Sequence, residues 1–330
     1  LPGGRFLVTE RPGRLRVIEP NGEMGEPVLG LPSMAAQGQG GLLDVLLDTD
    51  FVNNNTLYFC FSEPGQGGNS TALAKARLSS DRLRLEDLKV IFSQKPKVVS
   101  SAHFGCRIVE SQTNGKSDGM LFLTLGDRYS QMNDAQTLNN HQGKIIRIYK
   151  DGRVPDNNPF VNRFGALPEI WSYGHRNVQG AVLSTDGSLW THEHGPQGGD
   201  EINPVLSGRN YGWPVIGYGV NYGPGLPIHS SQQGEGMEQP RHFWVPSIAT
   251  AGLMIYSGDL FPNWQGDIFV GGLRGQQLAR VDLNNEGTMA MMEETLLNGI
   301  GRIRDIHQGP EGAIYIATEN RGILRLTPSN

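Results

Sequence analysis

The chain has 330 residues, of which 45 are Gly and 20 are Pro, and its formal net charge at pH 7 is −5. Gly and Pro are unfavourable inside helices, so this composition argues against a helical bundle, while 37% hydrophobic residues argue against disorder. The acidic balance without a Lys/Arg run speaks against a nucleic-acid partner, and no apolar run is long enough to cross a bilayer, so we expect no membrane span.

Short apolar runs bounded by Gly, Asp or Asn recur along the chain and predict β-strands. The clearest runs are residues 56–59, 120–123, 188–190, 267–270 and 313–316. Three of them follow a turn dipeptide, at Asp118-Gly119, Asp186-Gly187 and Glu311-Gly312. We expect one short helical turn within residues 130–140, and long loops at residues 157–167 and 217–240.

A weak internal repeat follows from a second pattern. An apolar–Arg–apolar triplet recurs at residues 15–17, 146–148, 279–281 and 324–326, and the Thr9-Glu10 end of one run resembles Thr318-Glu319. A unit of roughly 40–60 residues made of four short strands is typical of a β-propeller blade. We therefore expect an all-β, six-bladed β-propeller, a single domain over residues 1–330, with long loops building the site on one face. A β-sandwich with similar turn spacing is the alternative.

The chain has two cysteines, Cys60 and Cys106. Nothing in the sequence positions them against each other, so we interpret them as two buried, unbridged small hydrophobes, with one disulfide as the alternative. The N-terminal Leu1-Pro2-Gly3-Gly4 lacks a signal-peptide pattern, so the chain either never had one or is seen after its removal.

One histidine and one aspartate flank predicted strands. His103 precedes a strand, and His is the side chain best suited to general-base chemistry near neutral pH. Asp127 ends a strand, where its carboxylate could orient a base or only cap a turn. Because a single His is more often structural, the residues alone leave both interpretations open.

The polar residues near the middle of the chain include candidate ligands for two metals, zinc and calcium. His175, His192 and His194, with Glu193, could suggest zinc, but their spacing does not match a standard zinc site. Calcium prefers oxygen ligands, including backbone carbonyls, and a Gly-Pro pair with Asp and Glu nearby could offer them. A simple turn is the alternative for the Gly-Pro pair.

Arg302 and Arg304 alternate along the chain, so on a strand they share one face. Two like charges on one face are unfavourable unless an anion lies between them. Because Arg binds carboxylates and phosphates bidentately, the pair indicates a polycarboxylate or phosphate ligand, with a solvated edge strand as the alternative.

Read in chain order, a set of short motifs resembles the soluble PQQ-dependent glucose and aldose sugar dehydrogenases. The motifs are residues 38–43, 103, 125–127, 143–147, 173–177, 195–196, 200–203, 210–214 and 302–305. Each is weak alone, but together they follow the family order over nearly the whole chain. The resemblance implies a six-bladed propeller that oxidises an aldose sugar at C1 to the lactone, with PQQ and Ca²⁺ as cofactors and an external electron acceptor of unknown identity.

The resemblance also implies catalytic roles. His103 matches the general base that takes the proton from the anomeric hydroxyl, while a hydride passes from C1 to C5 of PQQ. Asp127 would orient His103, and Gln39 matches a residue that lines the same pocket and the cofactor. Arg176 matches the residue that stabilises charge developing on the quinone oxygen, and Asn177 matches its cofactor-contacting neighbour.

Further positions match ligands of calcium. The carbonyls of Gly195 and Pro196 match ligands of the PQQ-bound calcium, which acts as a Lewis acid on the quinone and neutralises a carboxylate. Glu201 and the Tyr211 carbonyl resemble ligands of a second, structural calcium. A loop-capping role for Glu201 is the alternative.

Three cations match residues that hold the carboxylates of PQQ. Arg302 and Arg304 match an arginine pair, and Arg274 occupies the position of a cofactor-binding Lys. An Arg there keeps the charge but changes the hydrogen-bond geometry.

Two positions depart from the family pattern and indicate which branch of the family the chain resembles. Ala102 stands where the glucose dehydrogenases have an acid, and Cys106 replaces a Gly that is common before the Arg. With the short loops, these differences favour the aldose-dehydrogenase branch, broad sugar specificity and a monomer, in the periplasm or secreted. The alternatives are a non-catalytic binding propeller, which would lack residues such as His103 and Arg176, and a metal-dependent propeller lactonase, which would need a carboxylate-rich metal centre.

Overall fold

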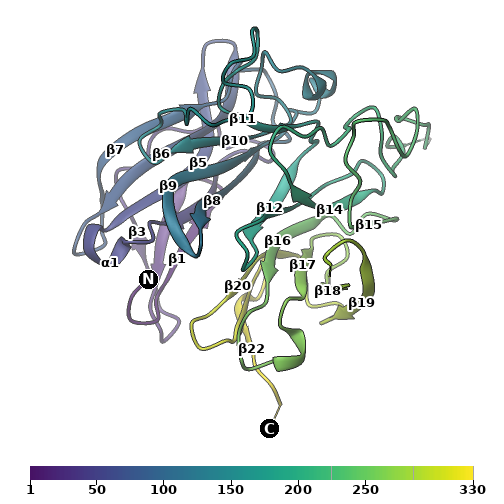
Figure 1. Ribbon diagram of the computed structural model, residues 1–330. Helices are drawn as coiled ribbons and strands as arrows, with labels where there is room; N and C mark the ends of the chain where they lie inside the picture. Colours follow the sequence, from purple (N-terminus) through teal and green to yellow (C-terminus); the bar gives the residue numbers. More distant parts are fainter. Residues whose placement is uncertain (224, 285, 330) are drawn as a thin grey trace. The chain divides into compact units, whose positions relative to one another are not determined.

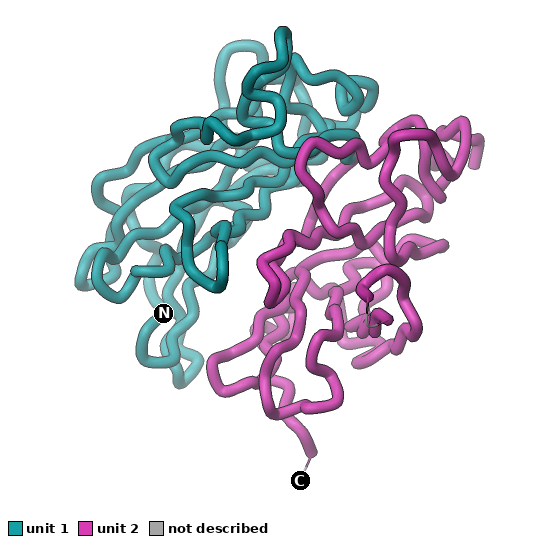
Figure 2. Tube along the Cα trace, viewed as in Figure 1, with its two compact units in different colours: residues 1–175 teal, residues 176–330 magenta. Residues whose placement is uncertain are grey.

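Figure 1 shows the fold of the chain in a computed structural model that describes residues 1–223, 225–284 and 286–329. Strands dominate, and within those residues no helix has the length and apolar character needed to span a membrane. The chain divides into two compact units, Leu1–His175 and Arg176–Asn330, coloured separately in Figure 2.

The first unit contains three antiparallel sheets whose strands follow one another in chain order. The first sheet has β1 (Phe6–Glu10), β2 (Arg14–Ile18) and β3 (Met24–Pro27). The second has β4 (Leu42–Leu47), β5 (Thr56–Gly65), β6 (Gly68–Leu78) and β7 (Leu85–Ser93). The third has β8 (Gly105–Thr113), β9 (Lys116–Leu125), β10 (Lys144–Tyr149) and β11 (Ile170–Tyr173). Two short helices, α1 (Phe51–Asn54) and the 3₁₀ helix η1 (Met132–Gln136), lie between strands.

The second unit repeats this plan with three further sheets. The first has β12 (Val178–Leu183), β13 (Leu189–Glu193), β14 (Asp200–Val205) and β15 (His242–Trp244). The second has β16 (Thr250–Ile255), β17 (Ile268–Gly272), β18 (Leu278–Leu283) and β19 (Ala290–Leu296). The third has β20 (Ile303–Gln308), β21 (Ile314–Thr318) and β22 (Gly322–Leu326). A 3₁₀ helix, η2 (Pro262–Trp264), precedes β17.

Six antiparallel sheets of three or four strands confirm the expected all-β, six-bladed class. The five predicted runs all overlap strands, and η1 lies within the segment expected to be helical. The expected loop at residues 157–167 contains no strand. The expected loop at residues 217–240 contains none among its described residues, which exclude residue 224. The single-domain expectation stays a prediction.

One predicted turn is wrong. The dipeptide Asp118-Gly119 lies inside β9, and the chain reverses earlier, at Asn114-Gly115, because Thr113 pairs with Lys116 across β8 and β9. Both residues of Asn114-Gly115 have positive φ, 53° and 72°, as expected for a tight hairpin. The turn dipeptide therefore placed the hairpin about four residues too late.

Strand β5 explains why the sheets of the first unit stack. Its residues Leu57, Phe59 and Phe61 enter one buried hydrophobic cluster, while Tyr58 and Cys60 enter another. Successive side chains of a strand point to opposite faces, so both faces of this sheet are buried. This explains why β5 reads as a continuous apolar run in the sequence.

Candidate active site

His103 and Asp127 meet in the first unit. Gly105 at the start of β8 pairs with Leu125 at the end of β9, so residues just before β8 and just after β9 lie at the same end of the sheet. The Nδ1 atom of His103 lies 2.6 Å from Oδ1 of Asp127, and both side chains are buried. Asp127 Oδ1 also accepts the backbone N–H of Tyr129, at 2.8 Å, which holds the carboxylate in place.

This contact has a definite consequence for the imidazole. A carboxylate can only accept hydrogen bonds, so Nδ1 of His103 carries the proton that Asp127 accepts. Nε2 is then the ring nitrogen with the lone pair, which is the arrangement that a general base needs. The pairing of His103 with Asp127 expected from the sequence is present in the structure.

Gln39 joins this pair from another loop. The side-chain Oε1 of Gln39 accepts the backbone N–H of His103 at 2.8 Å, and the backbone N–H of Gln39 donates to the carbonyl of Ser101 at 2.7 Å. Gly38, with φ of 59°, makes this approach possible, since a Cβ there would lie 2.5 Å from the Ser101 carbonyl oxygen. The structure therefore brings Gln39, His103 and Asp127 together, with Gln39 holding the backbone of the histidine.

In the second unit, Arg176 is held at the edge of a small pocket. Its backbone N–H donates to Glu193 Oε2 at 2.5 Å, its Nη1 donates to the His194 carbonyl at 3.1 Å, and its guanidinium lies 5.2 Å from the Trp213 ring centroid. The side chain is 3% exposed, and its buried Nε lacks a partner among the described residues. Such a donor is available to a ligand.

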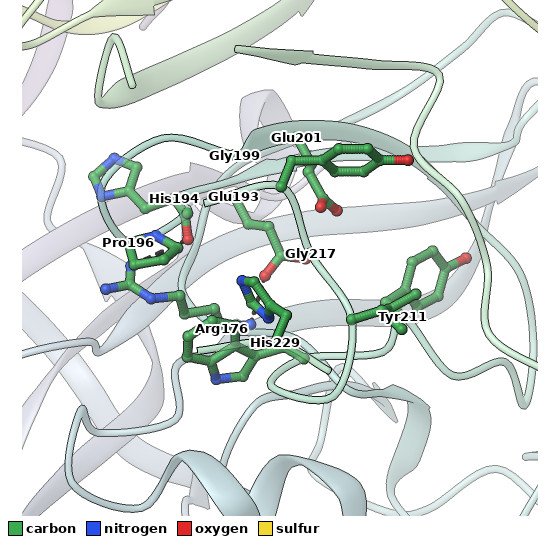
Figure 3. Close-up of a pocket in the computed structure, with 13 residues that line it drawn as sticks. Arg176, Glu193, His194, Pro196, Gly199, Glu201, Tyr211, Gly217 and His229 are labelled. Atoms are coloured by element: carbon green, nitrogen blue, oxygen red, sulfur yellow. Dashed lines mark hydrogen bonds between the residues drawn. The ribbon is translucent and has the colours of Figure 1, made fainter. Parts of the chain in front are cut away.

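Figure 3 shows the pocket, and four of the predicted residues line it together with Arg176: Gly195, Pro196, Glu201 and Tyr211. The Gly195 N–H donates to Asp200 Oδ1 at 3.0 Å, and a Cβ on Gly195 would lie 2.1 Å from the Gly198 carbonyl oxygen, so only Gly fits. The Tyr211 hydroxyl donates to Pro204 and accepts from the Leu206 N–H, so the hydroxyl is engaged in the protein.

Two carboxylates face each other across β13 and β14 at this pocket. Glu193 pairs directly with Glu201 in the strand register. Burial and the Glu193 charge raise the pKa of Glu201 well above its ordinary value. Like charges opposite each other on a sheet are destabilising, and a cation would relieve them. The described residues nevertheless hold no group of three or more His, Cys, Asp or Glu side chains placed to bind a metal.

Two of the histidines considered for zinc are engaged elsewhere. His192 Nε2 lies 2.9 Å from the Gly252 carbonyl, and His194 Nε2 lies 2.6 Å from the Thr250 carbonyl. A carbonyl oxygen accepts only, so these ring nitrogens donate and are not available to a metal. Asn177 is buried directly after Arg176, and its carbonyl accepts the His194 N–H at 3.2 Å.

Arg302 and Arg304 share one face, as expected, and one carboxylate lies between them. Glu319 Oε2 is 2.7 Å from Arg302 Nε, and Glu319 Oε1 is 2.5 Å from Arg304 Nη2. The arginine side chains remain 43% and 45% exposed, so both are partly open to solvent. The anion that the sequence placed between the two arginines is thus, in this structure, an internal glutamate.

Unlike Arg302 and Arg304, Arg274 makes no contact with Glu319 among the ion pairs of the described residues. It follows β17, its backbone N–H donates to Ile248, and its side chain is exposed. Its chain neighbour Leu273 accepts a 3.4 Å hydrogen bond from Arg302 Nη1, which links the two segments. The structure therefore joins Arg302 to Arg304 through Glu319, and links Arg274 to Arg302 only through the backbone of Leu273.

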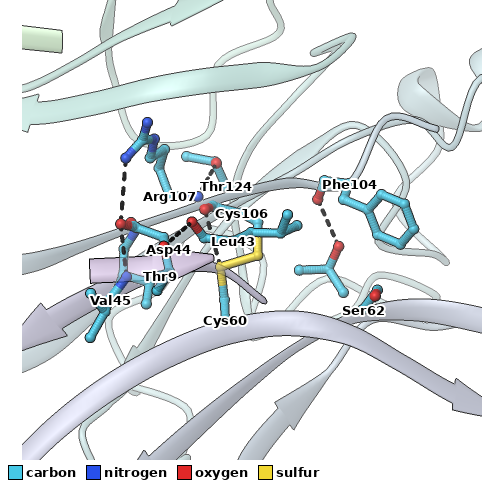
Figure 4. Close-up of a disulfide and its surroundings, with 12 residues drawn as sticks. Thr9, Leu43, Asp44, Val45, Cys60, Ser62, Phe104, Cys106, Arg107 and Thr124 are labelled. Atoms are coloured by element: carbon cyan, nitrogen blue, oxygen red, sulfur yellow. Dashed lines mark hydrogen bonds and ion pairs between the residues drawn. A yellow bond between two sulfur atoms is a disulfide. The ribbon is translucent and has the colours of Figure 1, made fainter. Parts of the chain in front are cut away.

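Cys60 and Cys106 form a disulfide, and the expectation of two unbridged thiols is wrong (Figure 4). The expected burial is confirmed, since the residues are 0% and 2% exposed. The two positions are 46 residues apart, but β5 and the start of β8 belong to neighbouring, contacting sheets, which brings the Cα atoms to 5.9 Å. That proximity arises from sheet packing and is absent from local sequence.

The sequence of this chain is similar to that of a known enzyme family. A family model described as glucose/sorbosone dehydrogenase matches residues 1–325. The chain belongs to this family. The resemblance stated from the sequence motifs is confirmed, and with it the enzyme class, a sugar dehydrogenase.

Individual members of the glucose/sorbosone dehydrogenase family agree with this assignment. An aldose sugar dehydrogenase of Escherichia coli K12 is 39% identical over 98% of this chain and 87% of its own length. The crystal structure of the soluble aldose sugar dehydrogenase from E. coli in the apo form gives a TM-score of 0.91 at 39% identity, covering 99% of this chain and 93% of that one. The PQQ-bound aldose sugar dehydrogenase from Streptomyces coelicolor gives 0.79 at 27% identity, covering 99% and 92%.

Three residues of this family member were missed by sequence reasoning as parts of the site. Glu319 bridges the arginine pair, and Glu193 holds the backbone of Arg176. Arg128, fully buried, places its guanidinium 3.5 Å from the Phe104 ring centroid and donates to the Ser100 carbonyl at 2.8 Å, which clamps the segment that carries His103. Glu193 stood out in the sequence only as a candidate zinc ligand, Glu319 carried a signal in the repeated Thr-Glu strand ending, and Arg128 carried none.

Proposed function

We propose that this chain is a PQQ- and Ca²⁺-dependent aldose sugar dehydrogenase that oxidises sugars at C1 to the lactone and passes the electrons to an external acceptor. The observation that carries the proposal is the buried His103–Asp127 contact of 2.6 Å, in a chain whose relatives include a PQQ-bound aldose sugar dehydrogenase. Such a pair is the base that removal of a hydroxyl proton needs.

The roles of the residues follow from their contacts. His103 Nε2 takes the proton of the anomeric hydroxyl, and the positive charge that forms on the imidazole is stabilised by Asp127. Gln39 keeps the base in position through the His103 N–H. When bound, PQQ supplies the acceptor, at C5, for the hydride that leaves C1 with its two electrons, and calcium supplies a Lewis acid.

The residues present fit an anionic, planar cofactor. Arg302 and Arg304 are partly exposed guanidiniums, a group suited to carboxylates, and Arg274 is a third exposed cation. Arg176 lines the pocket and has a buried Nε without a partner among the described residues, and Asn177 follows it. We assign these five residues to PQQ binding.

The second-unit pocket also fits a calcium ion. Gly195, Pro196, Glu201 and Tyr211 line this pocket together, and backbone carbonyls and carboxylates are the oxygen ligands that suit calcium. A divalent cation would also relieve the repulsion between Glu193 and Glu201. We assign Gly195 and Pro196 to the cofactor calcium, and Glu201 with the Tyr211 carbonyl to a second calcium.

The disulfide supports a location outside the reducing cytoplasm. Structural disulfides persist in oxidising compartments such as the periplasm and are rare where thiols are kept reduced. The Cys60–Cys106 bond therefore favours a periplasmic or secreted protein. That the protein works as a monomer stays a prediction from the sequence.

A reconstitution experiment tests the proposal. Purified protein freed of metal by a chelator is given PQQ and Ca²⁺, then glucose or another aldose with an artificial electron-acceptor dye. We expect dye reduction that requires both PQQ and Ca²⁺, with lactone as the sugar product. Matched reactions without PQQ, and with Mg²⁺ in place of Ca²⁺, are the controls. No reduction with any aldose would contradict the proposal.

A further inference from the structure

The segment that carries the proposed base has an unusual backbone. His103, Gly105 and Cys106 all have positive φ, at 51°, 64° and 82°. Gly adopts such conformations readily, but a residue with a Cβ does so only when its surroundings hold it there. Gly105 is required sterically, since a Cβ would lie 2.8 Å from the Gly126 nitrogen. Cys106 is different, because its left-handed backbone needs an external constraint.

The strand pairing at Cys106 supplies little constraint. The register of β8 against β9 shifts between Gly105 and Ile108, so Cys106 lies in an irregular stretch of the ladder. The next two N–H groups are held by side chains, that of Arg107 by Thr124 Oγ1 and that of Ile108 by Asp44 Oδ2, both at 2.9 Å. These bonds fix the chain after Cys106.

On the other side of Cys106, the chain is held through side chains and loops. The Phe104 carbonyl accepts the Thr71 hydroxyl at 2.7 Å, and Arg128 stacks on the Phe104 ring. His103 itself is tied to Gln39 and Asp127. Cys106 therefore lies between a fixed strand and the segment that carries the base.

The disulfide is the covalent constraint at this point. It joins Cys106 to Cys60, which is fully buried in the middle of β5 and belongs to the neighbouring sheet (Figure 4). Loss of this bond would leave a non-Gly residue at φ 82° free to relax toward negative φ, and such a rotation would turn Gly105, Phe104 and His103 relative to β8. A small displacement of a catalytic group is enough to slow a reaction strongly.

We propose that the Cys60–Cys106 disulfide positions the His103 base: it holds Cys106 in the left-handed conformation that aims the preceding residues at Asp127. The inference rests on the proposed role of His103 as the base. Cys60 and Cys106 are positioning residues that act through the backbone and touch neither sugar nor cofactor. Two consequences follow. Loss of the disulfide should lower kcat, and a Gly at position 106 should restore kcat because Gly adopts positive φ without the bond.

Two double variants separate positioning from simple stabilisation. Both Cys60→Ala/Cys106→Ala and Cys60→Ala/Cys106→Gly lack the disulfide, and they differ only in the conformational freedom of residue 106. We expect the Ala variant to lose about 10–100-fold in kcat, with KM and apoprotein PQQ affinity unchanged, and the Gly variant to recover most of kcat. Both variants should have a lower Tm than the parent.

A measurement on the apoprotein, without substrate, keeps the inference separate from the proposed function. The Nδ1 proton of His103, hydrogen-bonded to Asp127, gives an imidazole N–H resonance assigned by its loss in His103→Gln. We expect this resonance in the parent and in the Gly variant but not in the Ala variant. Failure of the proposed function would appear instead as turnover that survives in His103→Ala, whatever the resonance does.

The decisive comparison is between Ala and Gly at position 106. Equal kcat values in the two double variants, whether both unchanged or both reduced, would overturn the proposal, and so would an imidazole resonance that persists in the Ala variant. If the Ala double variant does not fold, Cys60→Ala against Cys106→Gly gives the same comparison, because each removes the bond by one substitution.

Discussion

The Oδ1 atom of Asp127 lies 2.6 Å from Nδ1 of His103, and both side chains are buried at the same end of β8 and β9. The carboxylate thereby selects the tautomer with its lone pair on Nε2. Removing the charge of Asp127 without changing its shape isolates this effect.

In Asp127→Asn, the amide N–H₂ can donate to Nδ1 and favour the wrong tautomer. We expect kcat to fall by about 10²–10⁴-fold while PQQ affinity stays unchanged, as for the orienting carboxylate of a catalytic triad. Steady-state kinetics with glucose and equilibrium PQQ binding measure the two effects. Asp151→Asn, at an exposed turn, is the matched control. A kcat within experimental error of the parent would remove the orienting role.

His103→Ala removes the proposed base itself. We expect turnover to drop by at least about 10²-fold, the usual contribution of a general base, with PQQ binding nearly intact. His307→Ala is a matched control, because His307 is largely exposed. Turnover that survives the loss of His103 would show that another group takes the proton.

The paired variant Arg302→Ala with Arg304→Ala tests the cation pair. Charge-assisted bonds to carboxylates are the strong hydrogen bonds of proteins, so we expect apoprotein PQQ affinity to weaken by about 10²-fold or more. Isothermal titration of the apoprotein with PQQ measures this. Arg325→Ala, which also removes a half-exposed arginine paired with a glutamate, should have no effect. Unchanged affinity in the paired variant would refute the assignment.

Glu319→Gln tests the internal anion between those arginines. Gln keeps an oxygen for one guanidinium but removes the negative charge that opposes an anionic ligand. We expect PQQ to bind about 2–5-fold more tightly, the size of one screened charge interaction near the surface, and the gain to shrink at high salt. Weaker binding in Glu319→Gln would mean that the carboxylate chiefly holds the arginines in place.

Lys144 gives a prediction for stability against pH. Its buried Nζ donates to the carbonyls of Asp134, Ala135 and Gln142 at 2.9, 3.2 and 2.5 Å, which holds the η1 segment. Burial lowers the pKa of Lys144 from 10.5 to about 7. Between these values the unfolded chain binds more protons than the folded one, so this group makes the free energy of unfolding rise with pH.

In Lys144→Met, that contribution to the pH slope should disappear. We expect the free energy of unfolding to rise less from pH 7 to pH 9 than in the parent, by up to about 1.4 kcal/mol per pH unit. The variant should also be less stable at pH 7, because three buried carbonyls lose their donor. Denaturant unfolding at both pH values measures this, with the exposed Lys89→Met as control. An unchanged slope would contradict the lowered pKa.

Much of the fold could be predicted from the sequence, because each blade is made of local antiparallel neighbours. Runs such as residues 267–270 stand out since both faces of these sheets are buried, and the Gly and Asp residues around them mark turns. The Asp118-Gly119 turn failed because Asp118 and Gly119 lie inside β9, whose pairing with β8 sets the reversal at Asn114-Gly115. The register of β8 against β9, and not the local turn preference of Asp-Gly, decides where the chain reverses.

Only part of the candidate site could be predicted from the sequence. The alternation of Arg302 and Arg304 predicted a shared face and an anion between them, but Glu319 reaches them from the end of the next strand. The contact of His103 with Asp127 depends on the register of two strands, and the contact of Cys60 with Cys106 depends on the packing of two sheets. Contacts of this kind are set by tertiary structure, so only family resemblance pointed to the first, and nothing pointed to the second.

The buried sulfur–sulfur bond beside His103 also bears on how the protein is produced. An expression host that makes the chain in its cytosol keeps thiols reduced, whereas export to an oxidising compartment lets the bond form. By the positioning role proposed for the Cys60–Cys106 bond, two preparations of identical sequence and equal cofactor content would then differ in specific activity. Thiol titration of each batch, done after unfolding because both sulfurs are inaccessible, would be the quality control that predicts its turnover.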